Sequence, residues 1–205
     1  MDNDPFARKP TPLLILLSGT AGSGKDSVIR RMKERGVPFE FVVTVTSRPP
    51  RPEEMEGRDY RFVSEADFKE LIRRDELLEH AEVYGQYKGI PGRPVREAMA
   101  SGKDVLIRID IQGVETVRRK CPEAVTIFLT ASSPEELKGR LLARGADSAE
   151  QVGIRLRTAQ AEMKRIPEFD YLVVNPDGRL EEAVDTIVAI IRAEHCRTTP
   201  GKARL

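Results

Sequence analysis

Short apolar runs alternate along this chain with longer stretches whose apolar residues recur at helical spacing. The runs predict strands, and the wholly apolar ones are typical of strands buried inside a parallel sheet. They lie at residues 13–17, 41–46, 104–113, 124–130 and 171–175. The other stretches predict helices at 26–35, 64–74, 113–120, 132–145, 155–165 and 180–194. Such alternation predicts an α/β fold in which helices cover both faces of a parallel sheet.

One segment, from about residue 41 to 91, breaks this alternation. It is richer in proline, turn residues and aromatics, so we interpret it as an inserted mixed α+β subdomain. The remainder, 13–40 together with 92–197, would then form one core. A chain of 205 residues is long enough for a single compact unit with an insertion. The ends, 1–12 and 198–205, are expected to be flexible tails.

The first apolar run leads into a glycine-rich stretch, SGTAGSGKDS, at residues 18–27. Gly19, Gly24 and Lys25 match the G-x-x-x-x-G-K spacing of a phosphate-binding loop, which needs a strand before it and a helix after it. The next position normally holds a serine or threonine whose hydroxyl helps to hold Mg²⁺. Here it is Asp26, an anion placed where phosphates would bind. The stretch is therefore a working nucleotide site, a modified one or a glycine-rich turn.

Charge and composition argue against several classes of function. The chain has 34 basic and 33 acidic residues, a net charge of +1, and no basic run, which argues against nucleic-acid binding. The first residues lack the apolar core of a signal peptide, and no apolar run is long enough to span a membrane. Cys121 and Cys196 lie far apart in a chain with only two histidines, so we expect neither a disulfide framework nor a zinc site. These features together predict a cytoplasmic protein.

Several blocks of sequence are specific enough to indicate a family. They read T-S-R-P-P-R-P-x-E-x-x-G-x-D-Y-x-F-V at 46–63, IDIQG at 109–113, RLLARG at 140–145 and VVN at 173–175. With the phosphate loop, they resemble the guanylate kinases from about Leu13 to the last helix. The resemblance implies a P-loop nucleoside monophosphate kinase core, a GMP-binding subdomain at 41–91 and a helical lid at about 138–157.

The resemblance implies transfer of the γ-phosphoryl group of ATP to GMP, and to dGMP, with Mg²⁺ required. Its products would be ADP and GDP, within purine nucleotide metabolism. We expect ATP and GMP or dGMP as partners, no nucleic acid, no membrane, and a monomer or weak homo-oligomer.

On the donor side, backbone N–H groups of the loop would cradle the ATP phosphates, and Lys25 would reach the transferring group. Arg140, Arg144 and Arg155 match the lid arginines of the family, which would stabilise the charge on that group. Asn175 matches a position near the adenine. The residues expected to bind ATP are Gly19, Thr20, Ala21, Gly22, Ser23, Gly24, Lys25, Asp26, Ser27, Arg140 and Asn175.

On the acceptor side, Arg48 and Arg51 would clamp the GMP phosphate across a proline-stiffened turn, and Tyr60 would add a hydroxyl. Thr44 and Glu79 match the positions that bind guanine, and a carboxylate suits its N1–H and N2–H₂ donors. The residues expected to bind GMP are Thr44, Arg48, Arg51, Tyr60, Glu79, Lys88 and Asp110. Those expected to act in catalysis are Lys25, Arg48, Arg144 and Arg155.

The phosphate loop and the third apolar run depart together from the family pattern. Arg108 lies where the family usually has an acidic residue, two before Asp110, so one carboxylate disappears where Asp26 supplies another. One hypothesis is that Asp26 and Arg108 form an ion pair across the site. The other is that Asp26 contacts Mg²⁺, with Ser27 as the alternative metal contact.

Two acceptor positions also depart from the family pattern. Lys88 replaces a tyrosine that touches the acceptor phosphate, a contact that a lysine can make as a point charge. Ile90 replaces the serine or threonine that helps to bind guanine, which removes a hydrogen bond worth about 1 kcal/mol. Guanine selectivity is therefore expected to be weaker but not lost.

Two other functions stay open on the sequence. The G-K-D-S loop resembles divergent guanylate kinases that include plant organelle forms, and also the ribose 1,5-bisphosphate phosphokinases. The sugar kinases lack the R-P-P-R…D-Y block that this chain has intact, so a guanylate kinase is favoured. The third possibility is a guanylate kinase-like binding module without catalysis. Such modules typically degrade the phosphate loop, whereas Gly19, Gly24 and Lys25 are retained here.

Overall fold

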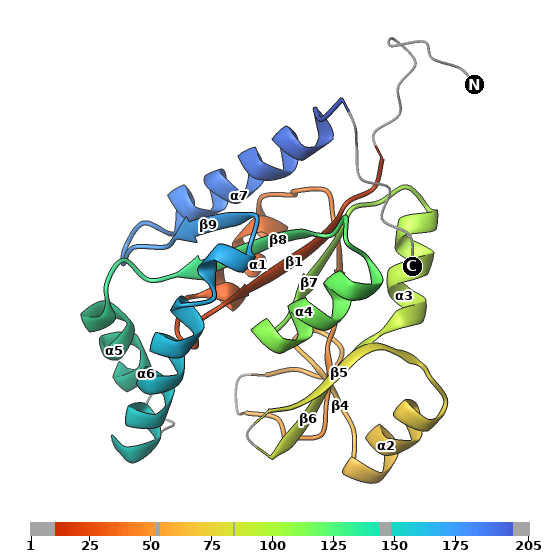
Figure 1. Ribbon diagram of the computed structural model, residues 1–205, viewed down its shortest axis with the longest axis horizontal. Coiled ribbons are helices and arrows are strands. Elements are labelled where there is room, and N and C mark those ends of the chain that lie inside the picture. Colours follow the sequence, from red (N-terminus) through yellow and green to blue (C-terminus); the bar gives the residue numbers. More distant parts are fainter. Residues whose placement is uncertain (1–10, 52–53, 84, 144–148, 199–205) are drawn as a thin grey trace.

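A five-stranded, fully parallel sheet forms the centre of the protein (Figure 1). The computed structural model describes residues 11–51, 54–83, 85–143 and 149–198. The strands, in spatial order, are β2 (Glu40–Val42), β7 (Val105–Arg108), β1 (Leu14–Gly19), β8 (Val125–Thr130) and β9 (Tyr171–Val174). Since β1 lies at the middle of the sheet, the glycine-rich stretch leaves it between the ends of β7 and β8.

Helices cover both faces of this sheet, which confirms the predicted α/β fold (Figure 1). One face carries α1 (Lys25–Glu34) and α7 (Leu180–His195), and the other carries α3 (Gly92–Ala100) and α4 (Ile111–Lys120). Successive residues of a strand point to opposite faces. Ile15 and Leu17 therefore pack with α1 and α7, while Leu14 and Leu16 pack with α3 and α4. Burial on both faces explains why β1 is apolar at consecutive positions.

A second, mixed sheet of four strands lies beside the core sheet (Figure 1). Its strands, in spatial order, are β4 (Arg61–Phe62), β3 (Val45–Thr46), β6 (Gln86–Pro91) and β5 (Leu77–Val83). β3 pairs in parallel with β4, and β6 pairs antiparallel with both β3 and β5. α2 (Glu65–Arg73) begins at Ser64, whose hydroxyl accepts the Asp67 N–H at 3.0 Å, and buries Phe68 beside Leu77. This sheet therefore has a small apolar core of its own.

Two further helices pack on each other beside the β9 end of the core sheet, and α6 faces the second sheet across the cavity described below (Figure 1). They are α5 (Pro134–Ala143) and α6 (Ala149–Met163), and the 3₁₀ helix η1 (Ile166–Glu168) connects α6 to β9. Leu141 of α5 and Val152 of α6 share an apolar cluster that Ala21 of the glycine-rich stretch joins. The glycine-rich stretch is thus packed against this helix pair.

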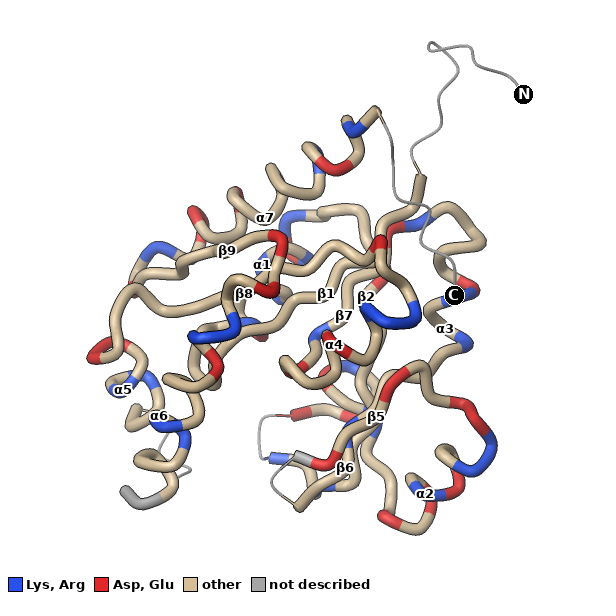
Figure 2. Tube along the Cα trace, viewed as in Figure 1, with Lys and Arg blue, Asp and Glu red and all other residues tan. Residues whose placement is uncertain are grey.

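The outer surface is mixed in charge. Lys and Arg are interspersed with Asp and Glu along α2 and α7 (Figure 2). On α2, for example, Lys69 pairs with Glu65 and Arg73 with Glu70, each at 2.6 Å. In the part of the chain that the structure describes, no helix is long and apolar enough to cross a membrane.

The apolar run at 41–46 was expected to form one strand, and that expectation is wrong. The chain leaves the core sheet after Val42 and enters the second sheet at Val45, so the run forms β2 and β3. β-branched residues suit a strand in either sheet, and no glycine or proline marks the change. Strand β6, at Gln86–Pro91, was not among the predicted strands, because its glycine and proline obscure the strand pattern.

All six predicted helices are present, but some boundaries and one residue were misplaced. α6 begins at Ala149 rather than at 155, and α3, which starts with glycine and has proline in its first turn, was not predicted. Asp110 was expected in the same strand as Arg108. It instead caps α4, where its Oδ1 accepts the Gly113 N–H at 2.9 Å. A capping carboxylate is favourable there because it satisfies a free helix N–H group.

Candidate active site

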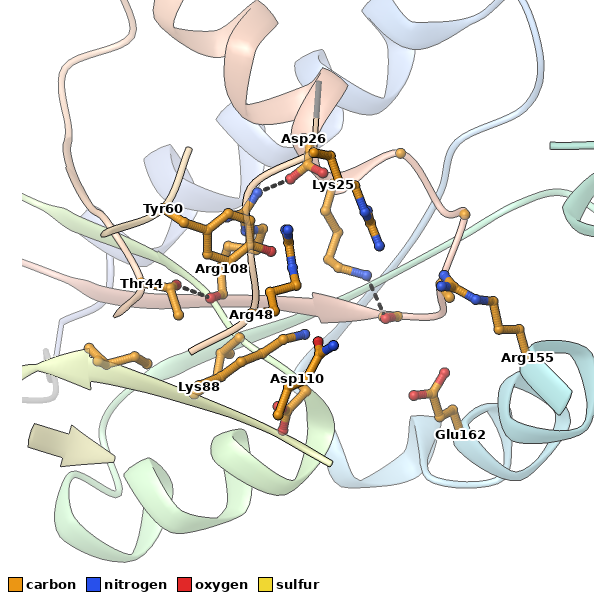
Figure 3. A pocket seen from close by; sticks show the side chains of 18 of the residues that line it. Lys25, Asp26, Thr44, Arg48, Tyr60, Lys88, Arg108, Asp110, Arg155 and Glu162 are labelled. Carbon is orange, nitrogen blue, oxygen red and sulfur yellow. Dashed lines mark hydrogen bonds and ion pairs between the residues drawn. The ribbon is translucent and has the colours of Figure 1, made fainter. Parts of the chain in front are cut away.

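A cavity of about 690 Å³ opens where the carboxyl ends of β1 and β7 face the second sheet and α6 (Figure 3). Most of the residues expected to bind nucleotide line it: Gly19, Ala21, Gly22, Gly24, Lys25, Asp26, Thr44, Arg48, Arg51, Tyr60, Glu79, Lys88, Asp110 and Arg155. Its volume lies within the range typical of small-molecule sites. The fold therefore brings the loop of the core and the second sheet to one cavity.

Two positions of the loop strongly favour glycine. At Gly19, φ is +134° and a Cβ atom would lie 1.9 Å from the Leu129 carbonyl oxygen. At Gly24, φ is +92° and a Cβ atom would lie 2.4 Å from Nδ2 of Asn175. Gly24 is also the N-cap of α1, so the loop delivers the N-terminus of a ten-residue helix to the cavity. Helix N–H groups and the helix dipole favour an anion at such a place.

Lys25 is held by the loop that precedes it. Its Nζ donates to the carbonyl oxygen of Gly19 at 2.6 Å and to that of Thr20 at 2.9 Å (Figure 3). Burial lowers the pKa of Lys25 to about 8, and the negative charges of Asp26 and Glu162 oppose this effect. A bound phosphate would favour the charged form further, since it places an anion beside a desolvated ammonium.

Asn175 and Arg140 brace the loop from outside the cavity. Nδ2 of Asn175 donates to the Ser23 carbonyl oxygen at 2.9 Å, and Nη2 of Arg140 donates to the Asn175 carbonyl oxygen at 2.8 Å. Arg140 also pairs with Glu136 one turn earlier on α5. The predicted ATP-binding residues that do not line the cavity are Thr20, Ser23, Ser27, Arg140 and Asn175. Arg144 lies outside the described residues.

Arg48 is buried and already aligned on the acceptor side. Its side chain is 8% exposed, and its two terminal nitrogens donate to the two Glu54 oxygens at 2.7 and 2.5 Å. Its guanidinium lies 4.7 Å from the centre of the Tyr60 ring. The Arg51 N–H also donates to Glu54, at 2.9 Å. The turn thus fixes a guanidinium fork of the kind that binds carboxylates or phosphates with two parallel bonds.

Glu79 lies on β5, lines the cavity and is only 4% exposed. Burial raises the pKa of Glu79 to about 8, and the negative charge of Asp110 adds to this effect. Ile90, fully buried on β6, pairs with Glu79 across the sheet. Lys88, two residues before it, also lines the cavity, and burial lowers its pKa. This side of the site therefore combines a carboxylate with several cations.

Asp26 and Arg108 form an ion pair, which confirms the first hypothesis for their joint departure from the family pattern. Nη1 of Arg108 donates to Oδ1 of Asp26 (Figure 3). The side chain of Arg108 is 9% exposed and that of Asp26 is 60% exposed. The acidic residue that the family usually has at position 108 is replaced by an arginine, and Asp26 supplies the compensating negative charge, so the two side chains together are neutral.

Comparisons with known proteins agree with this geometry. The family model described as guanylate kinase matches residues 11–194. The chain belongs to the guanylate kinase family. It is 46% identical over 95% of its length to guanylate kinase 2, chloroplastic/mitochondrial, of Oryza sativa subsp. japonica, and covers 69% of that protein. It is 44% identical to the guanylate kinase of Lactobacillus johnsonii, with 90% of each chain covered. The crystal structure of guanylate kinase from Anaplasma phagocytophilum superimposes with a TM-score of 0.77 at 32% identity, covering 93% of this chain and 89% of that one.

Two charged residues of this guanylate kinase site were not found from the sequence. Glu162 points from α6 into the cavity, and its buried Oε2 has no hydrogen-bond partner among the described residues (Figure 3). Burial raises the pKa of Glu162, while the charge of Lys25 opposes this effect. Glu54 holds Arg48 in place. Glu54 is the glutamate written out in the block at 46–63, which was the signal for it. Glu162 is one of two glutamates on a charged helix, so only the folded structure distinguishes it.

Proposed function

We propose that this protein transfers the γ-phosphoryl group of ATP to GMP, and to dGMP, with ADP and GDP as products. The observation that carries the proposal is that Lys25, on the phosphate loop, shares one cavity with Arg48 and Glu79 of the acceptor side. A single cavity that binds a donor phosphate and a nucleotide acceptor is what direct transfer between them requires. Membership of the guanylate kinase family supports the same reaction.

The chemistry requires positioning and charge neutralisation rather than a general base. A phosphate oxygen of GMP is already anionic, so it would attack the γ-phosphorus in line as the bond to the ADP oxygen breaks. Lys25 and the N–H groups of the loop would stabilise the charge that moves to the leaving group. Arg155, which points into the cavity from α6, would do the same for the transferring group, as would Arg144 (Figure 3).

The acceptor would be recognised at both of its ends. Arg48 and Arg51, with Tyr60 and Lys88, would bind the phosphate, and Arg48 would exchange its bidentate partner Glu54 for phosphate oxygens. Glu79 and Thr44 would bind the guanine. An ionised carboxylate accepts from the N1–H and N2–H₂ groups that guanine presents and adenine lacks, which favours GMP over AMP.

The residues of the cavity also fit a Mg²⁺ ion that arrives with ATP. Within the described ranges, no group of three or more His, Cys, Asp or Glu side chains could hold a metal alone. That fits a cation whose ligands are mainly phosphate oxygens and water. Asp26 lines the cavity, whereas Ser27 does not, so Asp26 is the favoured protein contact. Mg²⁺ would neutralise charge on the donor phosphates.

The direct test is ADP release from ATP and Mg²⁺ with GMP, dGMP, AMP, UMP or ribose 1,5-bisphosphate offered in parallel. Turnover is expected with GMP and dGMP alone. Turnover with the sugar phosphate alone would contradict the proposal and assign the protein to the sugar kinases. Absence of turnover with every acceptor would indicate a binding module. A Lys25→Met preparation purified in the same way controls for a contaminating kinase.

Binding of GMP is expected to release a proton near neutral pH. With the pKa of Glu79 raised to about 8, most of the free protein carries a protonated carboxyl at pH 7. Guanine requires the ionised form, so the affinity contributed by Glu79 should rise about tenfold between pH 7 and 9. Calorimetric titration with GMP in buffers of different ionisation enthalpy measures this proton release.

Glu79→Gln is the matched control for this pH dependence, because it removes the titrating group and keeps the shape. The difference between the two proteins isolates the titration of Glu79 from that of Lys25 and Lys88, whose pKa values are lowered by burial. A raised carboxyl pKa stabilises the fold at low pH, and this contribution is lost as pH rises toward 8. As the pH rises from about 4.5 to about 8, the wild type should therefore lose stability relative to Glu79→Gln. Identical pH profiles of GMP affinity in the two proteins would contradict the prediction.

A cytoplasmic location, and a monomer or weak homo-oligomer, remain predictions. One relative is described as chloroplastic/mitochondrial, so an organelle is the alternative location. Size-exclusion chromatography with light scattering measures the oligomeric state.

A further inference from the structure

Arg108 connects the donor side of the cavity to the acceptor side. It is the last residue of β7, and its guanidinium pairs through Nη1 with Asp26 on the first turn of α1. Nη2 of the same group donates to the backbone carbonyl oxygen of Asp59 at 2.6 Å. One side chain thus contacts both the helix that follows the phosphate loop and the segment that carries Tyr60.

Tyr60, one of the predicted acceptor-phosphate residues, packs against this guanidinium and against Arg48. Arg108 lies 4.2 Å from the centre of the Tyr60 ring, and Arg48 lies 4.7 Å from it. Cation–π contacts of this kind restrict both the ring and the cations. The Arg108 carbonyl oxygen accepts the Thr44 hydroxyl at 3.3 Å. The charge and position of Arg108 therefore act directly on the acceptor side.

We infer that the Asp26–Arg108 pair couples the two substrate sites, so that a donor nucleotide bound at the phosphate loop strengthens the binding of GMP. The inference rests on the proposed function and makes Arg108 a positioning residue. Without a donor nucleotide, the carboxylate of Asp26 neutralises Arg108. A bound Mg²⁺–nucleotide offers Asp26 a second cation, which weakens its hold on Arg108. More of the positive charge of Arg108 then acts on the acceptor phosphate.

Burial makes this competition effective. Arg108 is 9% exposed, so its interactions are screened by water far less than those of a surface ion pair. Asp26 is 60% exposed at the opening of the cavity and directly follows Lys25, where a second cation can reach it. Since coupling between two sites is reciprocal, bound GMP should also strengthen the binding of the donor.

The test is the Kd of GMP, measured by calorimetry without and with saturating Mg²⁺ and a non-hydrolysable ATP analogue. In wild type, the donor analogue should lower this Kd about fivefold or more. The coupling ratio is the Kd of GMP without the donor analogue divided by the Kd with it. In Asp26→Ser, Arg108 is no longer neutralised, so GMP should bind more tightly without the donor analogue, and this ratio should fall toward one. In Arg108→Ala, GMP should bind weakly in both states, with a ratio near one. The double variant should behave as Arg108→Ala.

Arg118→Ala is the matched control. Arg118 bridges a carboxylate and a backbone carbonyl in the same manner, through Asp170 at 2.7 Å and Glu168, and it does not line this cavity. Its ratio should equal that of wild type. Arg108→Lys, which keeps the charge but lacks the guanidinium fork, should give an intermediate ratio, and it serves in place of Arg108→Ala if that variant does not fold.

A purely structural role for the pair would lower thermal stability in the variants without changing the ratio, and that result would overturn the inference. Looser GMP binding by Asp26→Ser without the donor analogue would overturn it as well. A wild-type protein that turns over GMP but shows a ratio of one would contradict the coupling and leave the proposed function intact. Wild type that binds no GMP in either state would contradict the proposed function together with it.

Discussion

Lys25→Met is expected to lower kcat by roughly 10²–10³ while the protein remains folded. Nζ of Lys25 lies at 2.6 Å from the Gly19 carbonyl oxygen, at the point where the loop meets the cavity. Methionine keeps the unbranched apolar stem, so packing changes little. The ammonium that would stabilise charge on the transferring group is lost, and the loop amides alone do not replace it. Initial rates of ADP release at saturating ATP and GMP give kcat.

Lys33→Met is the matched control for this prediction, because Lys33 lies two turns further along α1 with its ammonium 4.1 Å from the centre of the Phe41 ring. It does not line the cavity, and its kcat should remain that of wild type. A Lys25→Met protein that keeps kcat within about fivefold of wild type would show that the loop backbone suffices, against the magnitude expected for a lost charge in such a site.

Arg48→Ala is expected to raise the KM for GMP by roughly two to three orders of magnitude. The substitution removes a buried guanidinium fork that is already aligned by Glu54 and by the Tyr60 ring. It also leaves the Glu54 carboxylate, only 16% exposed, without this partner. The free energy of unfolding should therefore fall by about 1–3 kcal/mol. Steady-state kinetics with varied GMP, together with urea unfolding, measure the two effects.

The double variant Arg48→Ala/Glu54→Gln separates these effects. A neutral amide is less costly to leave unpaired than a carboxylate, so the double variant should regain part of the stability. It should not regain affinity for GMP, since the phosphate partner is still absent. Recovery of the wild-type KM in the double variant would mean that Arg48 only offsets the charge of Glu54 and does not contact the substrate.

The core could be predicted because its pattern is local. The wholly apolar β1 and the helical spacing of α1 and α7 carry their own signals, and each is explained by burial on a defined face. The change of the chain from the core sheet at Val42 to the second sheet at Val45 could not be predicted in this way. It depends on which distant strands pair with each half, β7 for one and β4 and β6 for the other. Pairing partners of that kind are not encoded in a local run of β-branched residues.

The site was predicted where a motif fixes the geometry, as at Gly19, Gly24 and Lys25. The Asp26–Arg108 pair was inferred from two departures that compensate in charge, and the structure confirms the contact. The raised pKa of Glu79 and the raised pKa of Glu162 could not be predicted, because both result from burial by residues distant in sequence. Chemistry that depends on desolvation appears only once the chain is folded.

The Asp26–Arg108 pair also limits the order in which such a site can evolve. Arginine at 108 without an anion at 26 leaves a buried charge unneutralised, and an acidic residue at 108 facing Asp26 places like charges together. Either single step is unfavourable, so the shortest viable route between the two charge patterns passes through an uncharged residue at 108. Positions 26 and 108 should consequently vary together among relatives, and a lineage that has made the exchange is held there by the cost of reversing it one residue at a time.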